Sequence, residues 1–91
     1  MEQVSNLQVG SLVKSKAGRD EGRIYMVYHL VDSQYVELVD GNFKKTINPK
    51  LKKEKHLELL NITLDKIKAK LESNMKVFDS EIYSAIKKAF E

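Results

Sequence analysis

The sequence predicts a mainly β fold, a small curled antiparallel sheet or barrel, followed by an α-helical appendage of two helices. Short runs rich in β-branched and aromatic residues recur about every ten residues through the first half of the chain, separated by Gly- and Asp-containing turn signals. After about residue 60, the hydrophobic period changes from two residues to about 3.6, the period of a helix. The 91 residues have room for one small domain and an appendage. We therefore expect a barrel domain over residues 1–60 and a two-helix appendage over residues 61–91.

Four strands and a closing strand are expected in the first half of the chain. The four strands cover residues 9–15, 23–31, 34–39 and 42–47. Asp40-Gly41 is a strong hairpin signal, because both central residues of the favoured two-residue turn need a positive φ. Asn48-Pro49 is expected to end the fourth strand, and residues 56–60 to return as a short closing strand.

Two helices are expected in the second half. The first presents Leu64, Ile67, Leu71 and Met75 on one face, at spacings of three and four residues. The second runs from Asp79 or Ser80 to Phe90, with Asp79 as its N-cap. Because the connection is short, we expect a helical hairpin, in which Leu64, Ile67 and Leu71 face Ile82, Ile86 and Phe90.

The residue inventory argues against catalysis. No cysteine is present, which excludes a disulfide framework, a cysteine zinc site and a thiol nucleophile, and two histidines cannot complete a zinc site alone. Gly-rich phosphate-binding motifs and a nucleophile elbow are also missing. The acids in turns, Asp20, Glu21, Asp32 and Asp40, are interpreted as solvated turn residues. We expect no enzyme activity, no metal, no cofactor and no small-molecule substrate.

The chain carries no targeting or membrane signal that we recognise. Residues 1–10 have neither a basic start nor an apolar core, so they do not resemble a signal peptide. The longest nearly uncharged apolar stretch, residues 24–31, is far shorter than the roughly 20 residues of a spanning helix. The expected location is the cytoplasm, with no membrane partner.

Positive charge is concentrated in one place. Residues 44–56, the lysine-rich segment, hold six lysines and one glutamate, a charge of +5 in a chain whose net charge is +3. Such a concentration is typical of a polyanion partner. The alternative is a solvated loop beside Pro49. Leu51 interrupts the run and is expected to anchor it to the barrel.

Two further features have both a structural and a functional interpretation. Gly18 and Gly22 bracket the first loop, and a need for positive φ at two positions explains both. The same loop could place Lys16, Arg19 and Arg23 around a phosphate. The aromatic residues of the strands are either core or base-stacking residues, and the two most expected to show a face to solvent are Tyr35 and Phe43.

These residues resemble known families. Val9-Gly10-Ser11-Leu12-Val13, leading into Ala17-Gly18-Arg19-Asp20-Glu21-Gly22-Arg23, resembles a KOW motif. Val39-Asp40-Gly41-Asn42-Phe43-Lys44-Lys45, Asn48-Pro49-Lys50-Leu51-Lys52-Lys53 and Lys55-His56-Leu57 are similar to the ribosomal protein L-fourteen-e family and its short bacterial look-alikes. The match covers about residues 8–60, and residues 62–91 look like the tail of the bacterial relatives.

The resemblance implies an SH3-like barrel that binds structured RNA, with ribosomal RNA or the ribosome as partner and a role in translation. The implied RNA-binding residues are Lys16, Arg19, Arg23, Lys44, Lys45, Lys50, Lys52, Lys53, Lys55 and His56, and the implied loop residues are Gly18, Gly22, Asp40 and Gly41. Lys44-Lys45 departs from the Arg-Lys pair that the family favours, and thereby lacks bidentate recognition of phosphate. A rival function is a protein–protein adaptor of the NusG-KOW type, in which exposed Ile82, Ile86 and Phe90 would dominate binding to a protein partner.

Overall fold

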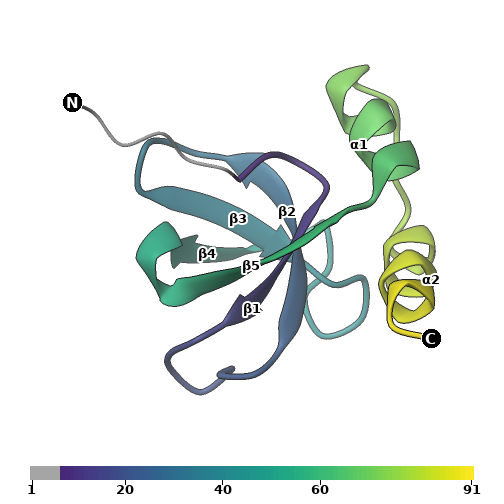
Figure 1. Ribbon diagram of the computed structural model, residues 1–91. Helices are drawn as coiled ribbons and strands as arrows, with labels where there is room; N and C mark the ends of the chain where they lie inside the picture. The colour runs from purple at the N-terminus through teal and green to yellow at the C-terminus, as the bar shows by residue number, and fades with distance from the viewer. Residues whose placement is uncertain (1–6) are drawn as a thin grey trace.

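The computed structural model describes residues 7–91, and the prediction that residues 1–10 are no signal peptide therefore falls mostly outside the described part. Five strands are followed by two helices (Figure 1). They are β1 (Ser11–Ser15), β2 (Ile24–Leu30), β3 (Tyr35–Val39), β4 (Lys50–Lys53), a 3-10 turn η1 (Glu54–His56), β5 (Leu57–Thr63), α1 (Asp65–Glu72) and α2 (Asp79–Ala89). The predicted mainly β fold with a helical appendage is confirmed.

The strands form a single antiparallel sheet in the order β4-β3-β2-β1-β5. The first four strands follow one another as hairpins, and β5 returns to pair with β1, so the sheet curls (Figure 1). Within residues 7–91, no pairing joins β4 to β5, and the curled sheet stays open. The predicted closing strand is confirmed as β5, which extends to Thr63, beyond the expected domain boundary at residue 60.

The fourth strand lies later in the chain than predicted. Residues 42–47 are irregular, and β4 begins at Lys50, after Pro49 rather than before it. The reason is Asp40, whose carboxylate accepts hydrogen bonds from the backbone N–H groups of Asn42 and Lys44 at 3.0 and 2.8 Å. An Asp side chain that binds nearby amides offers the backbone an alternative to the strand ladder. Asp40-Gly41 therefore opens a wide loop, residues 40–49, instead of a tight hairpin.

The sheet has a hydrophobic core on each face, because successive side chains of a strand point to opposite sides. The inner core, inside the curl, contains Leu7, Val13, Tyr25, Val27, Val36, Leu38 and Leu57. The second core lies between the sheet and the helices and contains Leu12, Met26, Val39, Ile67, Val77 and Ile82. The two helices lie together on one side of the sheet, which agrees with this second core (Figure 1).

The predicted packing of the two helices is confirmed in part, because Leu64, Ile67, Leu71, Ile82 and Ile86 all belong to or pack against the second core, which they share with the sheet. Ile82 is fully buried against the sheet residues of the second core, whereas Phe90 is half exposed and belongs to neither core. Helices of eight and eleven residues are marginal alone, and packing on the apolar outer face of the sheet stabilises them. An ion pair between Lys70 and Glu81 links the helices at the surface.

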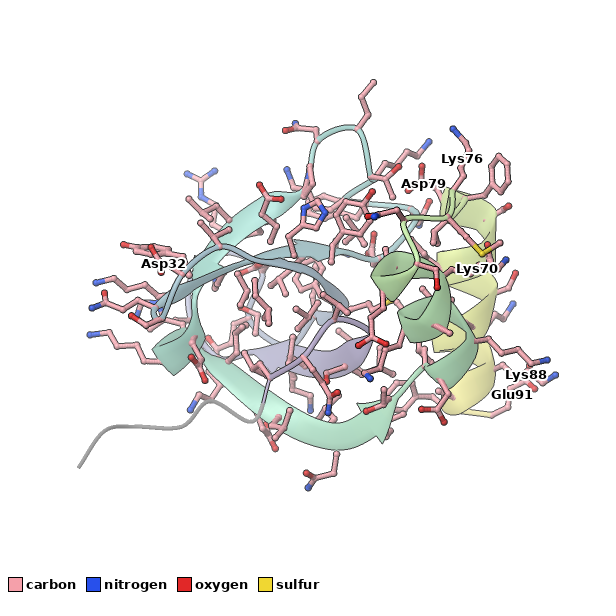
Figure 2. All side chains as sticks on the ribbon, turned by 90° about the horizontal axis from the view of Figure 1, so that it is seen from above. Asp32, Lys70, Lys76, Asp79, Lys88 and Glu91 are labelled. Atoms are coloured by element: carbon pink, nitrogen blue, oxygen red, sulfur yellow. The ribbon has the colours of Figure 1, made fainter. Side chains whose placement is uncertain are left out.

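The start of α2 also differs from the prediction. The N-cap position is held by Phe78, and the Asp79 carboxylate accepts hydrogen bonds from the backbone N–H and the hydroxyl of Thr46, at 2.8 and 3.2 Å. Asp79 therefore ties the 40–49 loop to α2 instead of capping the helix. Lys70, Lys76 and Lys88 project from the helical side of the molecule, far from Asp32 (Figure 2). Neither helix in residues 7–91 has the length and hydrophobicity to cross a membrane.

Candidate nucleic-acid interface

The loop between β1 and β2, residues 16–23, is closed by backbone hydrogen bonds. The N–H of Gly22 donates to the carbonyl of Ser15 at 2.8 Å, and the N–H of Ser15 donates to the carbonyl of Arg23 at 2.9 Å. Gly18 and Gly22 have φ values of +85° and +92°, in the left-handed region. The structural interpretation of both glycines is therefore confirmed, since other residues adopt this backbone only at a cost.

Replacing Gly18 or Gly22 by valine is expected to lower the free energy of unfolding by about 1–3 kcal/mol, because a β-branched side chain clashes with its own backbone at positive φ. At Gly22 an added Cβ meets nothing within 4 Å outside its chain neighbours, so the loss there is expected to come mainly from backbone strain. Urea unfolding of each variant measures it. A Gly22→Val protein as stable as the wild type would contradict the argument.

Asp20, at the tip of this loop, is buried, with 6% of its surface exposed. One carboxylate oxygen accepts hydrogen bonds from the Ser15 hydroxyl and the Lys52 ammonium, both at 2.9 Å. The other oxygen accepts a hydrogen bond from the Tyr25 hydroxyl at 3.0 Å, and the Lys50 ammonium lies 3.8 Å from it. The interpretation of Asp20 as a solvated turn acid is therefore wrong, whereas Glu21 beside it is exposed.

The contacts of Asp20 also determine its protonation. Burial by itself would raise the pKa of Asp20, but the hydrogen bonds from Lys52, Ser15 and Tyr25 outweigh it and lower the pKa to about 2. Burial, together with the hydrogen bond to Asp20, raises the pKa of the Tyr25 phenol. Asp20 is therefore a carboxylate and Tyr25 a neutral phenol near pH 7.

A signal for this cluster was present in the strand pattern. Val13 and Ser15 share one face of β1, and Tyr25 and Val27 share one face of β2. Both hydroxyls thus point toward the inner core, where an unpaired polar group is costly. The acid in the loop between them was the available partner.

The Asp20 cluster joins the β1–β2 loop to the lysine-rich segment. Lys50 and Lys52, on the same side of β4, both reach Asp20, and Lys52 also donates to the carbonyl of Ala17 at 2.8 Å. The Lys52 side chain is only 10% exposed, so its charge is paired with Asp20 inside the protein and does not face solvent. Leu51 lies on the opposite side of β4 and is 56% exposed, so the expectation that it anchors the segment is wrong.

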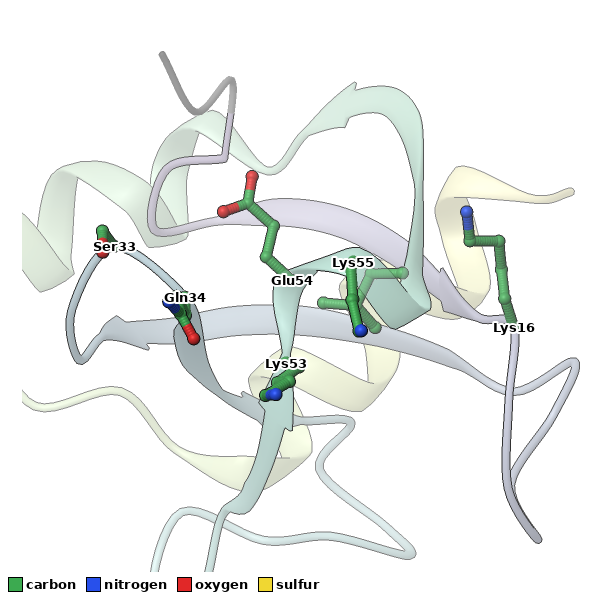
Figure 3. Close-up of a pocket in the computed structure, with 7 residues that line it drawn as sticks. Lys16, Ser33, Gln34, Lys53, Glu54 and Lys55 are labelled. Atoms are coloured by element: carbon green, nitrogen blue, oxygen red, sulfur yellow. The ribbon is translucent and has the colours of Figure 1, made fainter. Parts of the chain in front are cut away.

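Three other lysines surround a surface pocket of about 540 Å³ at the far end of β4 (Figure 3). Lys16 directly follows β1, Lys53 ends β4 and Lys55 is in η1. The pocket is also lined by Ser33, Gln34, Glu54 and Leu57. Three lysines against one glutamate leave the pocket positive. Backbone hydrogen bonds from Lys16 to the His56 carbonyl and from Glu54 to the Gln34 carbonyl hold its walls together, at 2.8 and 2.7 Å.

The 40–49 loop lies beside the β1–β2 loop. The guanidinium carbon of Arg23 is 3.9 Å from the centre of the Phe43 ring, and the Lys44 ammonium is 5.6 Å from it. Phe43 is 52% exposed, in agreement with its predicted exposure, while Tyr35 is half-buried under Lys53. Arg19 and Lys45 are exposed, and His56 is half-buried.

The β1–β2 loop, the 40–49 loop and residues 50–56 thus meet in one region, here named the basic surface. Nine of the ten predicted RNA-binding residues leave some side-chain surface for a ligand there, and Lys52 is the one turned inward. Residues 7–91 hold no cluster of three or more acids and histidines that could bind a metal ion. No family model matches the chain, and no curated protein matches it, so the basic surface itself is the basis for a functional inference.

Proposed function

We propose that this chain is a non-catalytic RNA-binding protein of the cytoplasm that binds ribosomal RNA or the ribosome through the basic surface. The observation that carries the proposal is the meeting of the Gly18–Gly22 loop and the lysine-rich segment at Asp20, through Lys50 and Lys52. Two segments about 30 residues apart, each basic and each part of the KOW resemblance, thereby form one surface. A scattered distribution of the same lysines would favour the solvated-loop alternative.

The strand arrangement supports the fold implied by the resemblance. We propose an SH3-like barrel of the KOW type, with the order β4-β3-β2-β1-β5 and the 3-10 turn η1 before the last strand as support. In this chain the β1–β2 loop carries the residues that resemble the KOW motif and lies against Lys52 of β4. The resemblance and the geometry therefore point to the same face of the molecule.

The chemistry of the basic surface favours phosphate contacts over base reading. A lysine ammonium is a flexible point charge, and contacts of this kind position a nucleic acid without reading its sequence. Each contact releases counterions from the RNA, which makes affinity depend on salt. Arg19 and Arg23 differ from the lysines, because a planar guanidinium can bond two acceptors or stack on a base.

Replacing Lys16, Lys53 and Lys55 together by glutamine is expected to reduce the slope of log K against log salt by about 2–3, at 0.7–0.9 per phosphate contact. These three lysines line one pocket and leave the buried Asp20 cluster intact. The measurement is a titration of a structured ribosomal RNA fragment at several salt concentrations. The proposal also predicts that affinity falls by similar factors for all RNAs.

The matched control replaces Lys66, Lys87 and Lys88, exposed on the two helices, by glutamine. It removes the same charge from the opposite part of the molecule and should leave the salt slope within about 1 of the wild type. Equal slopes for the two triple variants would reduce the lysine-rich segment to a solvated surface and remove the main support for RNA binding.

The helical side keeps a second candidate function, a protein–protein adaptor. Its exposed large apolar residues are Met75, Phe78, Tyr83 and Phe90. Ile82 is buried and Ile86 is half-buried, so of the three residues expected to dominate such binding only Phe90 is well exposed. This function predicts binding to a protein that responds little to salt and is weakened by Phe78→Ser with Phe90→Ser. Capture of ribosomes by this protein, before and after RNase treatment, separates the two functions. Binding through RNA should be lost after the treatment, and binding to a protein should remain.

A further inference from the structure

Phe43 is an exposed aromatic residue of the basic surface that lies against two cationic side chains. Single exposed apolar residues are common and need no explanation by themselves. Phe43, however, has the Arg23 guanidinium 3.9 Å from its ring centre and the Lys44 ammonium at 5.6 Å. The ring is thus bordered by two cations and still more than half exposed.

The loop that carries Phe43 is held on both sides of this residue. The Asp40 carboxylate accepts the N–H groups of Asn42 and Lys44, and the Lys44 carbonyl accepts the N–H groups of Asp40 and Gly41, at 2.9 and 3.1 Å. Farther along, Thr46 is bonded to Asp79 of α2. The position of the ring is therefore determined before any ligand arrives, which reduces the entropic cost of binding.

We propose that Phe43, backed by Arg23, is a stacking platform for one unpaired RNA base, so that the preferred ligand is RNA with a loop, bulge or free end. This inference rests on the proposed RNA-binding function and names the class of RNA within it. Bases stack on aromatic rings and on guanidinium planes regardless of their sequence. In an uninterrupted A-form duplex the bases are stacked on each other and cannot reach such a platform. Lys44 and Lys45 would hold the phosphates that flank the stacked base.

The first test compares a hairpin RNA with an unpaired loop against a fully paired duplex with the same number of phosphates. Phe43→Leu keeps an apolar side chain but removes the aromatic face, and should weaken hairpin binding by about 5- to 150-fold. Duplex binding should change by less than about twofold, because its phosphate contacts remain. Phe90→Leu makes the same change in an exposed aromatic at the other end of α2 from the loop, and should alter neither affinity.

A second variant reports stacking directly. The chain contains no tryptophan and four tyrosines, so Phe43→Trp introduces a single tryptophan at the platform, whose emission can be excited separately from that of the tyrosines. Hairpin RNA should quench its emission by stacking, and the duplex should not. Equal quenching by both RNAs, or a Phe43→Leu protein that still prefers the hairpin as strongly as the wild type, would overturn the platform. Wild-type protein that binds neither RNA at low salt would overturn RNA binding as well, so the two failures are distinguishable.

Discussion

Replacing Asp20 with asparagine is expected to lower the free energy of unfolding by about 3–5 kcal/mol, because breaking a buried ion pair leaves an uncompensated buried charge. The charge left behind is the ammonium of Lys52, whose side chain is 10% exposed. The amide of asparagine would also direct a donor toward a cluster that already supplies three donors. For a domain of this size the melting temperature should fall by more than about 10 °C.

The matched control is Asp32→Asn. The Asp32 carboxylate is exposed and accepts the backbone N–H groups of Gln34 and Tyr35, both at 2.8 Å. An asparagine oxygen can accept the same two hydrogen bonds, so stability should change by less than about 1 kcal/mol. Similar thermal unfolding curves for the two variants would show that Asp20 is an ordinary turn residue.

The pH dependence of stability supplies an independent check on Asp20. Its pKa in the folded protein is about 2, below the ordinary value of 3.8, so the folded state binds fewer protons than the unfolded state between these values. The contribution is therefore complete above about pH 4 and is lost as the pH falls toward 2. It amounts to about 2 kcal/mol, at 1.36 kcal/mol per pKa unit. The difference in stability between wild type and Asp20→Asn should shrink by about that amount between pH 5 and pH 2.

Replacing Gly41 with alanine is the second change with a large expected effect, about 3–5 kcal/mol of lost stability. A Cβ on Gly41 would lie 2.2 Å from the backbone carbonyl oxygen of Asp79 and 2.7 Å from the backbone nitrogen of Tyr83. These two atoms belong to the first turn of α2, which cannot yield without moving the helix. The φ of +80° adds the cost of a left-handed backbone.

Gly22→Ala is the control for Gly41→Ala. Gly22 has a similar φ of +92°, but an added Cβ there meets nothing within 4 Å. It should cost only the backbone term, about 1–2 kcal/mol. The difference between the two variants in urea unfolding measures the contact with α2, and faster amide hydrogen exchange in α2 of the Gly41→Ala protein would locate it. Equal losses in the two proteins would contradict the close packing of the loop on the helix.

This contact assigns a structural role to the helical appendage. Through Gly41 and Asp79, α2 supports the 40–49 loop, which carries Phe43 at the edge of the basic surface. The sequence pattern alone suggested a helical hairpin, because it shows which residues of a helix are apolar but not what covers them. Removing the helices is therefore expected to disturb the loop as well as to expose the second core.

Local sequence patterns determined the elements of this protein. Runs of β-branched and aromatic residues predicted β1, β2 and β3, since strand periodicity needs only neighbouring residues, and β5 was expected as a shorter closing strand over residues 56–60. The positive φ of Gly18 and Gly22 was predicted from their places in the first loop, because glycine tolerates that backbone more readily than other residues. The second helix was placed to within a residue, from Asp79. The charge of the lysine-rich segment was likewise evident from the positions of the lysines in the sequence.

The tertiary structure alone determined which charged groups pair and which apolar faces pack together. Asp20 and Lys52 are 32 residues apart, and only the pairing of β4 with β3 brings the lysine under the β1–β2 loop. A turn acid next to solvent and one above a core containing two hydroxyls look alike in sequence. In the same way, Thr46 of the 40–49 loop is bonded to Asp79 of α2, and the helices cover the apolar outer face of the sheet. Each outcome depends on contacts between distant segments, whose free energies exceed the local preferences that a sequence pattern records.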